Sequence, residues 1–211
     1  MRSSIACCVR LSVDTEQPQG DVLARAWVVL DEHGVVAVPT ETFYGLAVSV
    51  FDQVACARVF EIKGRPPTKA LPCIVSGIEQ LERVASEIPT LVSELSTRFW
   101  PGPLTLIVPA RATVAAASET GTIAVRVSSL PLARELAAIA GPVTATSANV
   151  SGAPPATTAD EVLAQLGGSV DLVLDGGATG GGLASTIVDV TRGKLELVRE
   201  GAIAFRDVKR S

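Results

Sequence analysis

The sequence predicts an α/β fold built on a twisted, mixed sheet with helices packed against it. Apolar runs typical of strands alternate along the chain with segments whose apolar residues recur at helical spacing. The last two strand-like runs, 185–190 and 195–199, are separated only by a short turn, which indicates an antiparallel hairpin within the sheet. Apolar residues make up 47% of the chain and aromatic residues only 4%, so the core must consist mostly of Val, Leu, Ile and Ala.

The expected helices have a periodic apolar face and, in several cases, a recognisable cap or stop. In chain order they are 21–33, with Leu23, Trp27 and Leu30 on one face and Gly34 as a stop; 52–63, with Asp52 as N-cap and Gly64 beyond its end; 78–85; 91–99, between Pro89 and Pro101; 132–140; and 158–166, which opens with a capping box from Thr158 to Glu161.

The expected strands are short apolar runs bounded by turn residues. They are 35–38, 71–75, 104–108, 123–127, 142–146, 171–174, 185–190 and 195–199. Residues 1–20 are expected to form an N-terminal extension or a first strand. No break in composition divides residues 21–211, which predicts a single domain.

Composition excludes several classes of protein. A formal net charge of −4 excludes a strongly cationic coat for nucleic acid, although not a local basic cleft. No apolar run approaches the roughly 18 residues of a membrane span, and the start of the chain is too weakly apolar for a secretory signal. The four cysteines, Cys7, Cys8, Cys56 and Cys73, form no disulfide framework or zinc spacing, so we expect a reduced cytoplasmic protein. The chain has one histidine, which excludes chemistry that needs several. This residue, His33, is expected near the C-terminal end of a helix.

Candidate ligand-binding groups follow the ends of several elements. They are the segments 40–42, 63–66, 147–152 and 175–177. In open α/β sheets ligands bind beyond the ends of strands, where small hydroxyls and backbone N–H groups meet anions. For each segment alone, the alternative is an ordinary capped turn.

The cationic residues leave two interpretations open. Lys63 and Arg65 lie one residue apart after a helix, so they suit either a phosphate or a solvated helix end. Arg126 stands inside an apolar strand, where it must either reach solvent at an edge or pair with an anion, and Arg199 raises the same question. Five of the seven residues 176–182 are glycine, which fits either a passive loop or a flap that closes on substrate.

The motifs together resemble the YrdC-like threonylcarbamoyl-AMP synthases, in their short single-domain form. The resemblance is carried by PTETFYGL at 39–46, KGRP at 63–66, FWPGPLT at 99–105, AVRV at 124–127, SANVSG at 147–152 and STIVD at 185–189. It implies a YrdC-like twisted sheet around one concave basic cavity, without the C-terminal domain of longer relatives. It also implies a nucleotidyltransferase that joins L-threonine, bicarbonate and ATP into L-threonylcarbamoyl-AMP and releases pyrophosphate.

The resemblance further assigns roles and partners. Thr40, Arg126 and Ser185 match threonine-binding positions, and Lys63, Arg65, Thr122, Ser147, Asn149 and Arg199 match positions around ATP; of these, Lys63, Arg65, Ser147 and Asn149 are the expected catalytic residues. Mg²⁺ is expected with ATP, with no tightly bound cofactor and no protein metal site. The product would serve proteins that transfer the threonylcarbamoyl group to tRNA, and weak binding of RNA is left open.

The chain also departs from the family pattern. Ile74 stands where many relatives have a histidine in contact with threonine, Pro67 and Pro155 replace family serines, and Ala184 replaces an acidic residue. Two other functions are therefore kept as alternatives: a module that handles carbamoyl-adenylate, of the hydrogenase-maturation type, and a non-catalytic module that binds nucleotide or RNA.

Overall fold

The computed structural model describes residues 8–66 and 70–210 of the chain. The helices are α1 (Gly20–Asp31), α2 (Gln53–Lys63), α3 (Leu81–Val84), α4 (Thr90–Phe99), α5 (Pro131–Ala140), α6 (Ala159–Leu166) and α7 (Phe205–Val208). The strands are β1 (Val9–Ser12), β2 (Val36–Pro39), β3 (Tyr44–Ala47), β4 (Cys73–Ile74), β5 (Leu104–Pro109), β6 (Thr122–Arg126), β7 (Val143–Thr144), β8 (Thr146–Ser147), β9 (Leu172–Asp175), β10 (Thr186–Asp189) and β11 (Glu196–Arg199). The predicted α/β class with mixed parallel and antiparallel pairing is confirmed.

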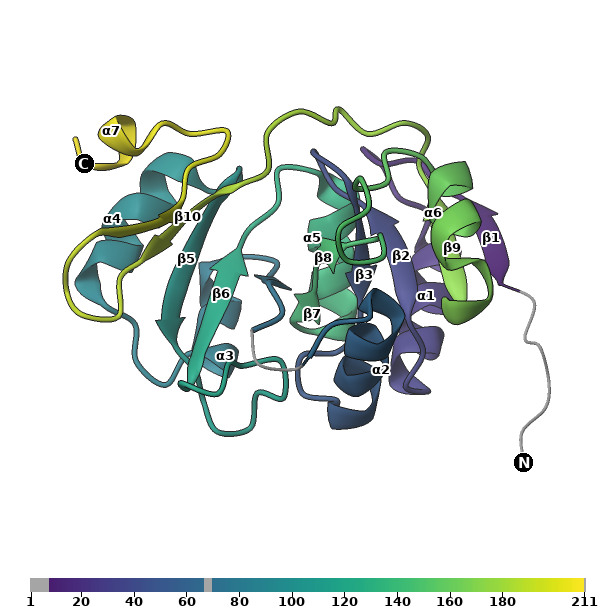
Figure 1. Cartoon of the computed structure of the whole chain (residues 1–211), viewed down its shortest axis with the longest axis horizontal. Helices are drawn as coiled ribbons and strands as arrows, with labels where there is room; N and C mark the ends of the chain where they lie inside the picture. Colours follow the sequence, from purple (N-terminus) through teal and green to yellow (C-terminus); the bar gives the residue numbers. More distant parts are fainter. Residues whose placement is uncertain (1–7, 67–69, 211) are drawn as a thin grey trace.

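The strands form two sheets, and the prediction of one sheet was wrong. One has the order β1-β9-β2-β3-β8, and the other has the order β11-β10-β5-β6-β4-β7. Figure 1 shows the first sheet in the half that carries the N-terminus and β5, β6 and β10 in the other half. Parallel β1–β9 pairing brings residues 9–12 into the first sheet, and β10 and β11 pair antiparallel as the short turn predicted.

The segment 142–146, expected as one buried strand, divides between the two sheets. Its first part, β7, pairs with β4, and its last part, β8, pairs with β3. Between them the Ala145 N–H donates to the Pro72 carbonyl oxygen at 2.7 Å, which satisfies the backbone at the crossing point. An apolar run in the sequence does not reveal which of two sheets each residue joins.

Strand β3 was not predicted from the sequence, because the residues before it were interpreted as a loop carrying functional groups. Those residues form a tight turn instead: the Thr40 N–H donates to the Phe43 carbonyl oxygen at 3.1 Å. The turn lets β3 pair antiparallel with β2, with Pro39 opposite Tyr44. Polar residues of the motif are thereby held at the ends of two buried strands.

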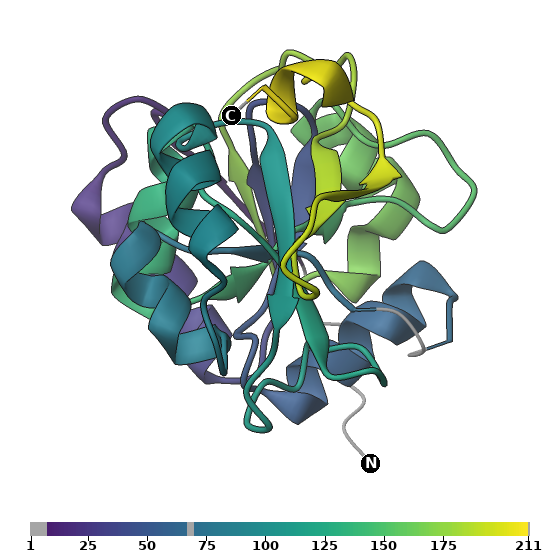
Figure 2. The same ribbon diagram turned by 90° about the vertical axis from the view of Figure 1, so that its left-hand side faces the viewer.

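Helices cover both faces of the sheets, as Figure 2 shows from the side. Strand β2 illustrates why: Val36 and Val38 pack with α1 and α5, whereas Val35 and Ala37 belong to the core on the opposite face. A strand buried on both faces reads as a continuous apolar run, which is how 35–38 appears in the sequence. The buried thiols of Cys56 and Cys73 are not joined in a disulfide, and Cys7 lies outside the described residues.

The predicted helix caps are confirmed at α2 and α6. Asp52 Oδ1 accepts from the Ala55 N–H at 3.0 Å, and Gly64 ends α2 in the left-handed conformation. Thr158 Oγ1 accepts from the Glu161 N–H at 3.2 Å, and the Glu161 carboxylate accepts from the Thr157 N–H at 2.6 Å. His33 follows the end of α1, as expected, and its Nδ1 lies 2.5 Å from Asp52 Oδ2.

The glycine-rich segment 176–185, which we call the strap, runs from β9 to β10 and so joins the two sheets. Figure 1 shows it crossing the top of the molecule. Its glycine-rich part is held by hydrogen bonds to other segments. Tyr44 Oη donates to the Gly177 carbonyl oxygen, the Thr179 N–H donates to the Thr157 carbonyl oxygen, and the Gly181 N–H donates to the Thr42 carbonyl oxygen, each at 2.8 Å. The strap is therefore held against the turn at 40–43 in this structure.

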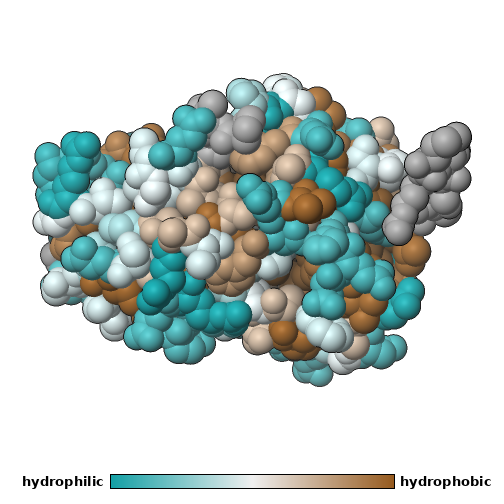
Figure 3. All heavy atoms as spheres, turned by 90° about the horizontal axis from the view of Figure 1, so that it is seen from below, coloured by the Kyte–Doolittle hydropathy of each residue, from teal (hydrophilic) through white to brown (hydrophobic). Residues whose placement is uncertain are grey.

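On the face seen in Figure 3, the most hydrophobic residues form small separate patches among less hydrophobic and polar ones. Within the described residues, no helix combines the length and the apolarity needed to cross a membrane.

We expect Tyr44→Phe to loosen the strap. Burial raises the pKa of this phenol to about 12, so at neutral pH it stays protonated and donates to Gly177. Removing the hydroxyl leaves the Gly177 carbonyl and the Gly176 N–H without this partner, at a cost of roughly 1–3 kcal/mol in the free energy of unfolding. Urea denaturation measures that loss, and amide exchange across 176–185 should become faster than in the control Thr97→Val. Unchanged exchange would show that Tyr44 does not anchor the strap.

Candidate active site

A cavity of about 680 Å³ lies between residues of the two sheets and gathers most of the residues singled out in the sequence. The expected site residues that line it are Thr40, Lys63, Arg65, Arg126, Ser147, Asn149, Ser185 and Arg199. Thr122, expected near ATP, is not among its lining residues. It begins β6, at the other end of that strand from Arg126, and its Oγ1 lies 2.8 Å from Ser118 Oγ.

One row of residues across the six-stranded sheet forms the floor of the cavity. Ile74 on β4 is in register with Arg126 on β6, and Ile187 on β10 is in register with both Thr105 on β5 and Arg199 on β11. The pairing of Leu106 with Val125 places Thr105 and Arg126 next to each other in the antiparallel β5–β6 ladder. All five side chains line the cavity, because residues in register point to the same face of a sheet.

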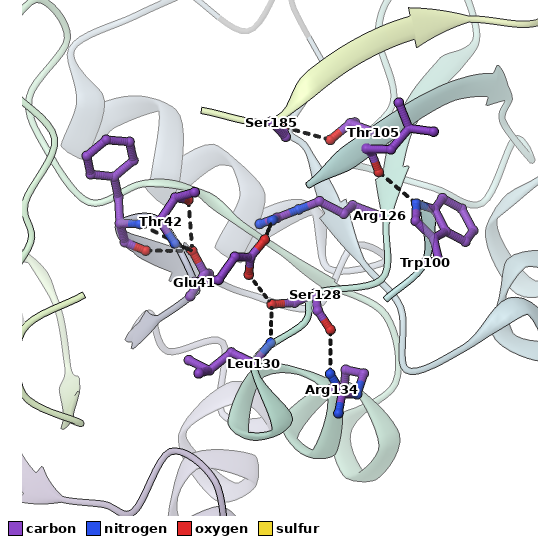
Figure 4. Close-up of polar contacts among 12 residues, drawn as sticks. Glu41, Thr42, Trp100, Thr105, Arg126, Ser128, Leu130, Arg134 and Ser185 are labelled. Atoms are coloured by element: carbon purple, nitrogen blue, oxygen red, sulfur yellow. Dashed lines mark hydrogen bonds and ion pairs between the residues drawn. The ribbon is translucent and has the colours of Figure 1, made fainter. Parts of the chain in front are cut away.

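Arg126 is buried, with only 8% of its surface exposed, and pairs with a carboxylate from the chain itself. Its Nη1 forms an ion pair with Glu41 Oε1, as Figure 4 shows. Glu41 Oε2 in turn accepts from Ser128 Oγ at 2.5 Å, and Ser128 is fully buried. Of the two interpretations left open by the sequence, the structure supports pairing with an anion.

Burial and a neighbouring cation act together on Arg126. Desolvation is the larger effect and repulsion from Arg199 the smaller, and together they lower the pKa of Arg126 to about 10. The guanidinium therefore remains charged at neutral pH. A buried charge of this kind needs a partner, which explains why Glu41 accompanies it.

Lys63 has a structural role that the sequence did not reveal. The predicted helix end is confirmed, because Lys63 is the last residue of α2. Its side chain was expected to meet a phosphate or solvent beyond the helix, but it is only 3% exposed. Its Nζ donates to the carbonyl oxygens of Ser147 and Asn149 at 2.5 and 3.0 Å, and lies 3.4 Å from Asn149 Oδ1. Burial, together with the nearby Arg65, lowers the pKa of Lys63 to about 8.

Arg65 presents hydrogen-bond donors that have no acceptor in residues 8–66 and 70–210. Its Nε and Nη2 are buried and have no hydrogen-bond partner among the described residues. The guanidinium carbon lies 5.4 Å from the centre of the Phe60 ring, which supports one face of the group. Buried donors of this kind favour an anionic ligand in the cavity.

The remaining polar groups hold one another in place. Asn149 Nδ2 donates to the carbonyl oxygens of Val150 and Ala153 at 2.9 and 2.7 Å, which leaves its Oδ1 toward Lys63. At the other end of the cavity, Arg199 Nη2 donates to the Ser185 carbonyl oxygen at 2.7 Å. Thr105 Oγ1 donates to Ser185 Oγ at 2.9 Å (Figure 4).

Thr40 is 4% exposed, and its hydroxyl donates to the Phe43 carbonyl oxygen at 2.8 Å within its own turn. Thr105 and Ser128 were not identified as site residues from the sequence, and Glu41, although inside the candidate segment 40–42, was given no role. Glu41 lies inside the motif at 39–46, and Thr105 lies inside that at 99–105. Only the alternation of inward-facing positions could have indicated Thr105, and no local signal indicates Ser128.

Three of the four departures from the family pattern line the cavity: Ile74, Pro155 and Ala184. Ile74 is 1% exposed and offers an apolar surface beside Arg126. Pro67 lies outside the described residues. Within those residues, no three His, Cys, Asp or Glu side chains are grouped so as to hold a metal ion.

An α/β fold whose central cavity collects cations and small polar groups is typical of proteins that bind anionic small molecules. The model of the Sua5/YciO/YrdC family, described as "Telomere recombination", matches residues 28–201. The chain belongs to this family.

Curated relatives support the same assignment. The chain is 39% identical over 182 residues to the threonylcarbamoyl-AMP synthase of Pyrococcus abyssi, covering 85% of this chain and 54% of that protein. It is 40% identical over 189 residues to the threonylcarbamoyl-AMP synthase of Shigella boydii, covering 87% of this chain and 97% of that protein. The chain thus spans little more than half the length of the P. abyssi protein and of a Bacillus subtilis relative, of which it covers 57%.

Solved structures agree with the fold. P. abyssi Sua5 complexed with L-threonine superposes with a TM-score of 0.90 at 36% identity, covering 96% of this chain and 60% of that chain. Escherichia coli YciO, at 24% identity and a TM-score of 0.85, shows that the fold extends to more distant proteins.

We expect Lys63 to lose its proton near pH 8. Because its pKa in the folded protein lies below the ordinary value of 10.5, the unfolded chain binds more protons between these two values. The contribution of this group to stability therefore rises with pH across that interval, while its positive charge in the cavity disappears. The chain has four lysines, so ¹³Cε-lysine NMR can follow the titration, with the Lys63 signal assigned by its loss in Lys63→Arg. A midpoint near 10 would contradict the burial argument.

Proposed function

We propose that this protein makes L-threonylcarbamoyl-AMP from L-threonine, bicarbonate and ATP, with release of pyrophosphate. One observation carries the proposal: the same cavity is lined by Arg126, which is paired with a carboxylate, and by other cations that have no carboxylate partner among the described residues. The names of the relatives support it, as does the L-threonine bound to P. abyssi Sua5.

The polyphosphate of ATP suits the end of the cavity that holds Lys63 and Arg65, and Arg199 adds positive charge at the end that holds Ser185. None of the three forms an ion pair with a carboxylate within the described part of the chain. Two buried donors of Arg65, Nε and Nη2, have no acceptor among the described residues. Phosphate oxygens are strong acceptors, and a guanidinium can bind them with two parallel hydrogen bonds.

The amino acid suits Arg126. Glu41 occupies Nη1, and the remaining edge of the guanidinium, Nε with Nη2, has the geometry that a carboxylate binds side-on. Thr40, Ser185 and Thr105 place hydroxyl groups on the same cavity. We therefore assign the threonine carboxylate to Arg126, with Thr40 and Ser185 beside it.

The reaction proceeds without a covalent enzyme intermediate in this proposal. The amine of threonine takes up the carbon of bicarbonate to give a carbamate and water. A carbamate oxygen then attacks the α-phosphorus of ATP, and the bond to the β-phosphate bridging oxygen breaks to release pyrophosphate. The chain's contribution is positioning and preorganised positive charge: Lys63 and Arg65 beside the phosphates, with Ser147 and Asn149 fixing Lys63.

ATP enters as its magnesium complex in this proposal, as a substrate and not as a resident cofactor. Among the described residues, no Asp or Glu lines the cavity, so the phosphates and water would supply most of the ligands of the ion. The product would pass to proteins that transfer the threonylcarbamoyl group to tRNA in the cytoplasm.

Pyrophosphate release tests the proposal against its alternatives. We expect release only when ATP, L-threonine and bicarbonate are all present. Release with carbamoyl phosphate in place of threonine and bicarbonate would favour the carbamoyl-adenylate module; HypF structures, at 19% identity, share the fold alone. Nucleotide binding without release under any condition would favour the non-catalytic module.

We expect Arg65→Ala to fold normally and to lose turnover. The side chain makes no hydrogen bond through Nε or Nη2 to the described protein, so its removal should leave the unfolding midpoint nearly unchanged. Losing one charged donor to a transition state costs roughly 3–4 kcal/mol, which corresponds to about 10²–10³ in kcat.

Pyrophosphate release at saturating ATP measures that loss. Arg206→Ala, which removes an exposed arginine from α7, is the matched control. Turnover equal to that of the control would exclude Arg65 from the phosphate site.

A further inference from the structure

We propose that Glu41 is a specificity-determining residue: its carboxylate keeps polyanions away from Arg126 and so reserves this arginine for a ligand with a single carboxylate. The identity of that ligand as an amino acid rests on the proposed function. The charge arrangement itself is a property of the cavity and can be tested without turnover.

Glu41 is fixed in place from several directions. Besides Arg126, its carboxylate binds Ser128 Oγ at 2.5 Å, and Ser128 Oγ also accepts from the Leu130 N–H at 3.2 Å (Figure 4). The turn that carries Glu41 is tied to the strap, because the Thr42 carbonyl oxygen accepts from the Gly181 N–H and from Thr179 Oγ1, both at 2.8 Å. A carboxylate held in this way cannot easily swing aside when a ligand arrives.

The cations of the cavity differ in their partners. Arg126 alone among its lining cations forms an ion pair with a carboxylate of the described chain. Lys63 is bonded to carbonyl and amide oxygens, Arg199 to the backbone and hydroxyl of Ser185, and Arg65 has unused donors. Glu41 therefore balances the charge of Arg126, whereas Lys63 and Arg65 at one end of the cavity and Arg199 at the other keep uncompensated positive charge.

This difference discriminates between anions by their charge. Repulsion from Glu41 grows with the number of charges on the ligand, and at a buried site solvent screens it only weakly. A ligand with a single carboxylate has one charge for Glu41 to repel, and two hydrogen bonds from the guanidinium of Arg126 compensate that repulsion. A polyphosphate has several charges for Glu41 to repel. It is attracted more strongly by Lys63, Arg65 and Arg199, which have no carboxylate partner in the described part of the chain. Without Glu41, Arg126 would be one more uncompensated cation and would attract polyphosphate as well.

The experiment compares wild-type protein with Glu41→Gln, which keeps the shape of the side chain and removes its charge. Glu94→Gln removes the same charge from the exposed face of α4 and is the matched control. The probe is inorganic tripolyphosphate, added at saturating ATP while the KM for threonine is measured by pyrophosphate release. We expect added tripolyphosphate to change the KM for threonine less than twofold in wild type and in Glu94→Gln. In Glu41→Gln, we expect it to raise this KM at least tenfold.

Calorimetric titration with tripolyphosphate alone gives a second readout that needs no activity. We expect wild type to bind one molecule of tripolyphosphate and Glu41→Gln to bind two. Ser128→Ala, which removes a hydrogen bond that fixes Glu41, should shift both readouts in the same direction by a smaller factor, and it supplies the test if Glu41→Gln does not fold.

Equal stoichiometry and equal competition in all variants would overturn the role of Glu41. A wild-type protein without threonine-dependent pyrophosphate release would overturn the proposed function instead. In that event the calorimetric titration still decides whether Glu41 excludes polyanions.

Discussion

The buried ion pair between Arg126 and Glu41 is the interaction on which the arrangement of the cavity depends. A guanidinium at the end of a buried strand requires a carboxylate, and that carboxylate comes from a turn in the other sheet. The pair therefore joins the two sheets at the cavity floor. Because Ser128 and the strap hold the same turn, the position of Arg126 depends on contacts from several parts of the chain.

The division of the strands into two sheets explains why the cavity exists. The chain changes sheets between β3 and β4, again within segment 142–146, and a third time along the strap. Between these crossings, loops from one sheet face a row of side chains from the other. Lys63 then closes one side by donating to the carbonyl oxygens of Ser147, at the end of β8, and of Asn149 just beyond it. The end of α2 is therefore held in place by a residue that is itself a catalytic candidate. Stability and ligand binding consequently share residues here.

Much of the fold was predictable from the sequence, because caps and apolar periodicity are local signals. Asp52 and Thr158 begin helices as expected. The site was predictable where polar residues follow strands, and most of the expected residues do meet in one cavity. The partner of Arg126 was not predictable, since Glu41 lies 85 residues away and nothing local indicates the pairing. The buried contacts of Lys63 were not predictable for a similar reason: its acceptors lie more than 80 residues further along the chain.

The central claim is that this cavity joins an amino acid, bicarbonate and ATP into one adenylate. Mass spectrometry of the products formed with ¹³C-bicarbonate, L-threonine and ATP tests it most directly. The account predicts a nucleotide with the mass of threonylcarbamoyl-AMP that carries the ¹³C label and is absent when threonine is omitted. A nucleotide product without the label, or no new nucleotide at all, would contradict it.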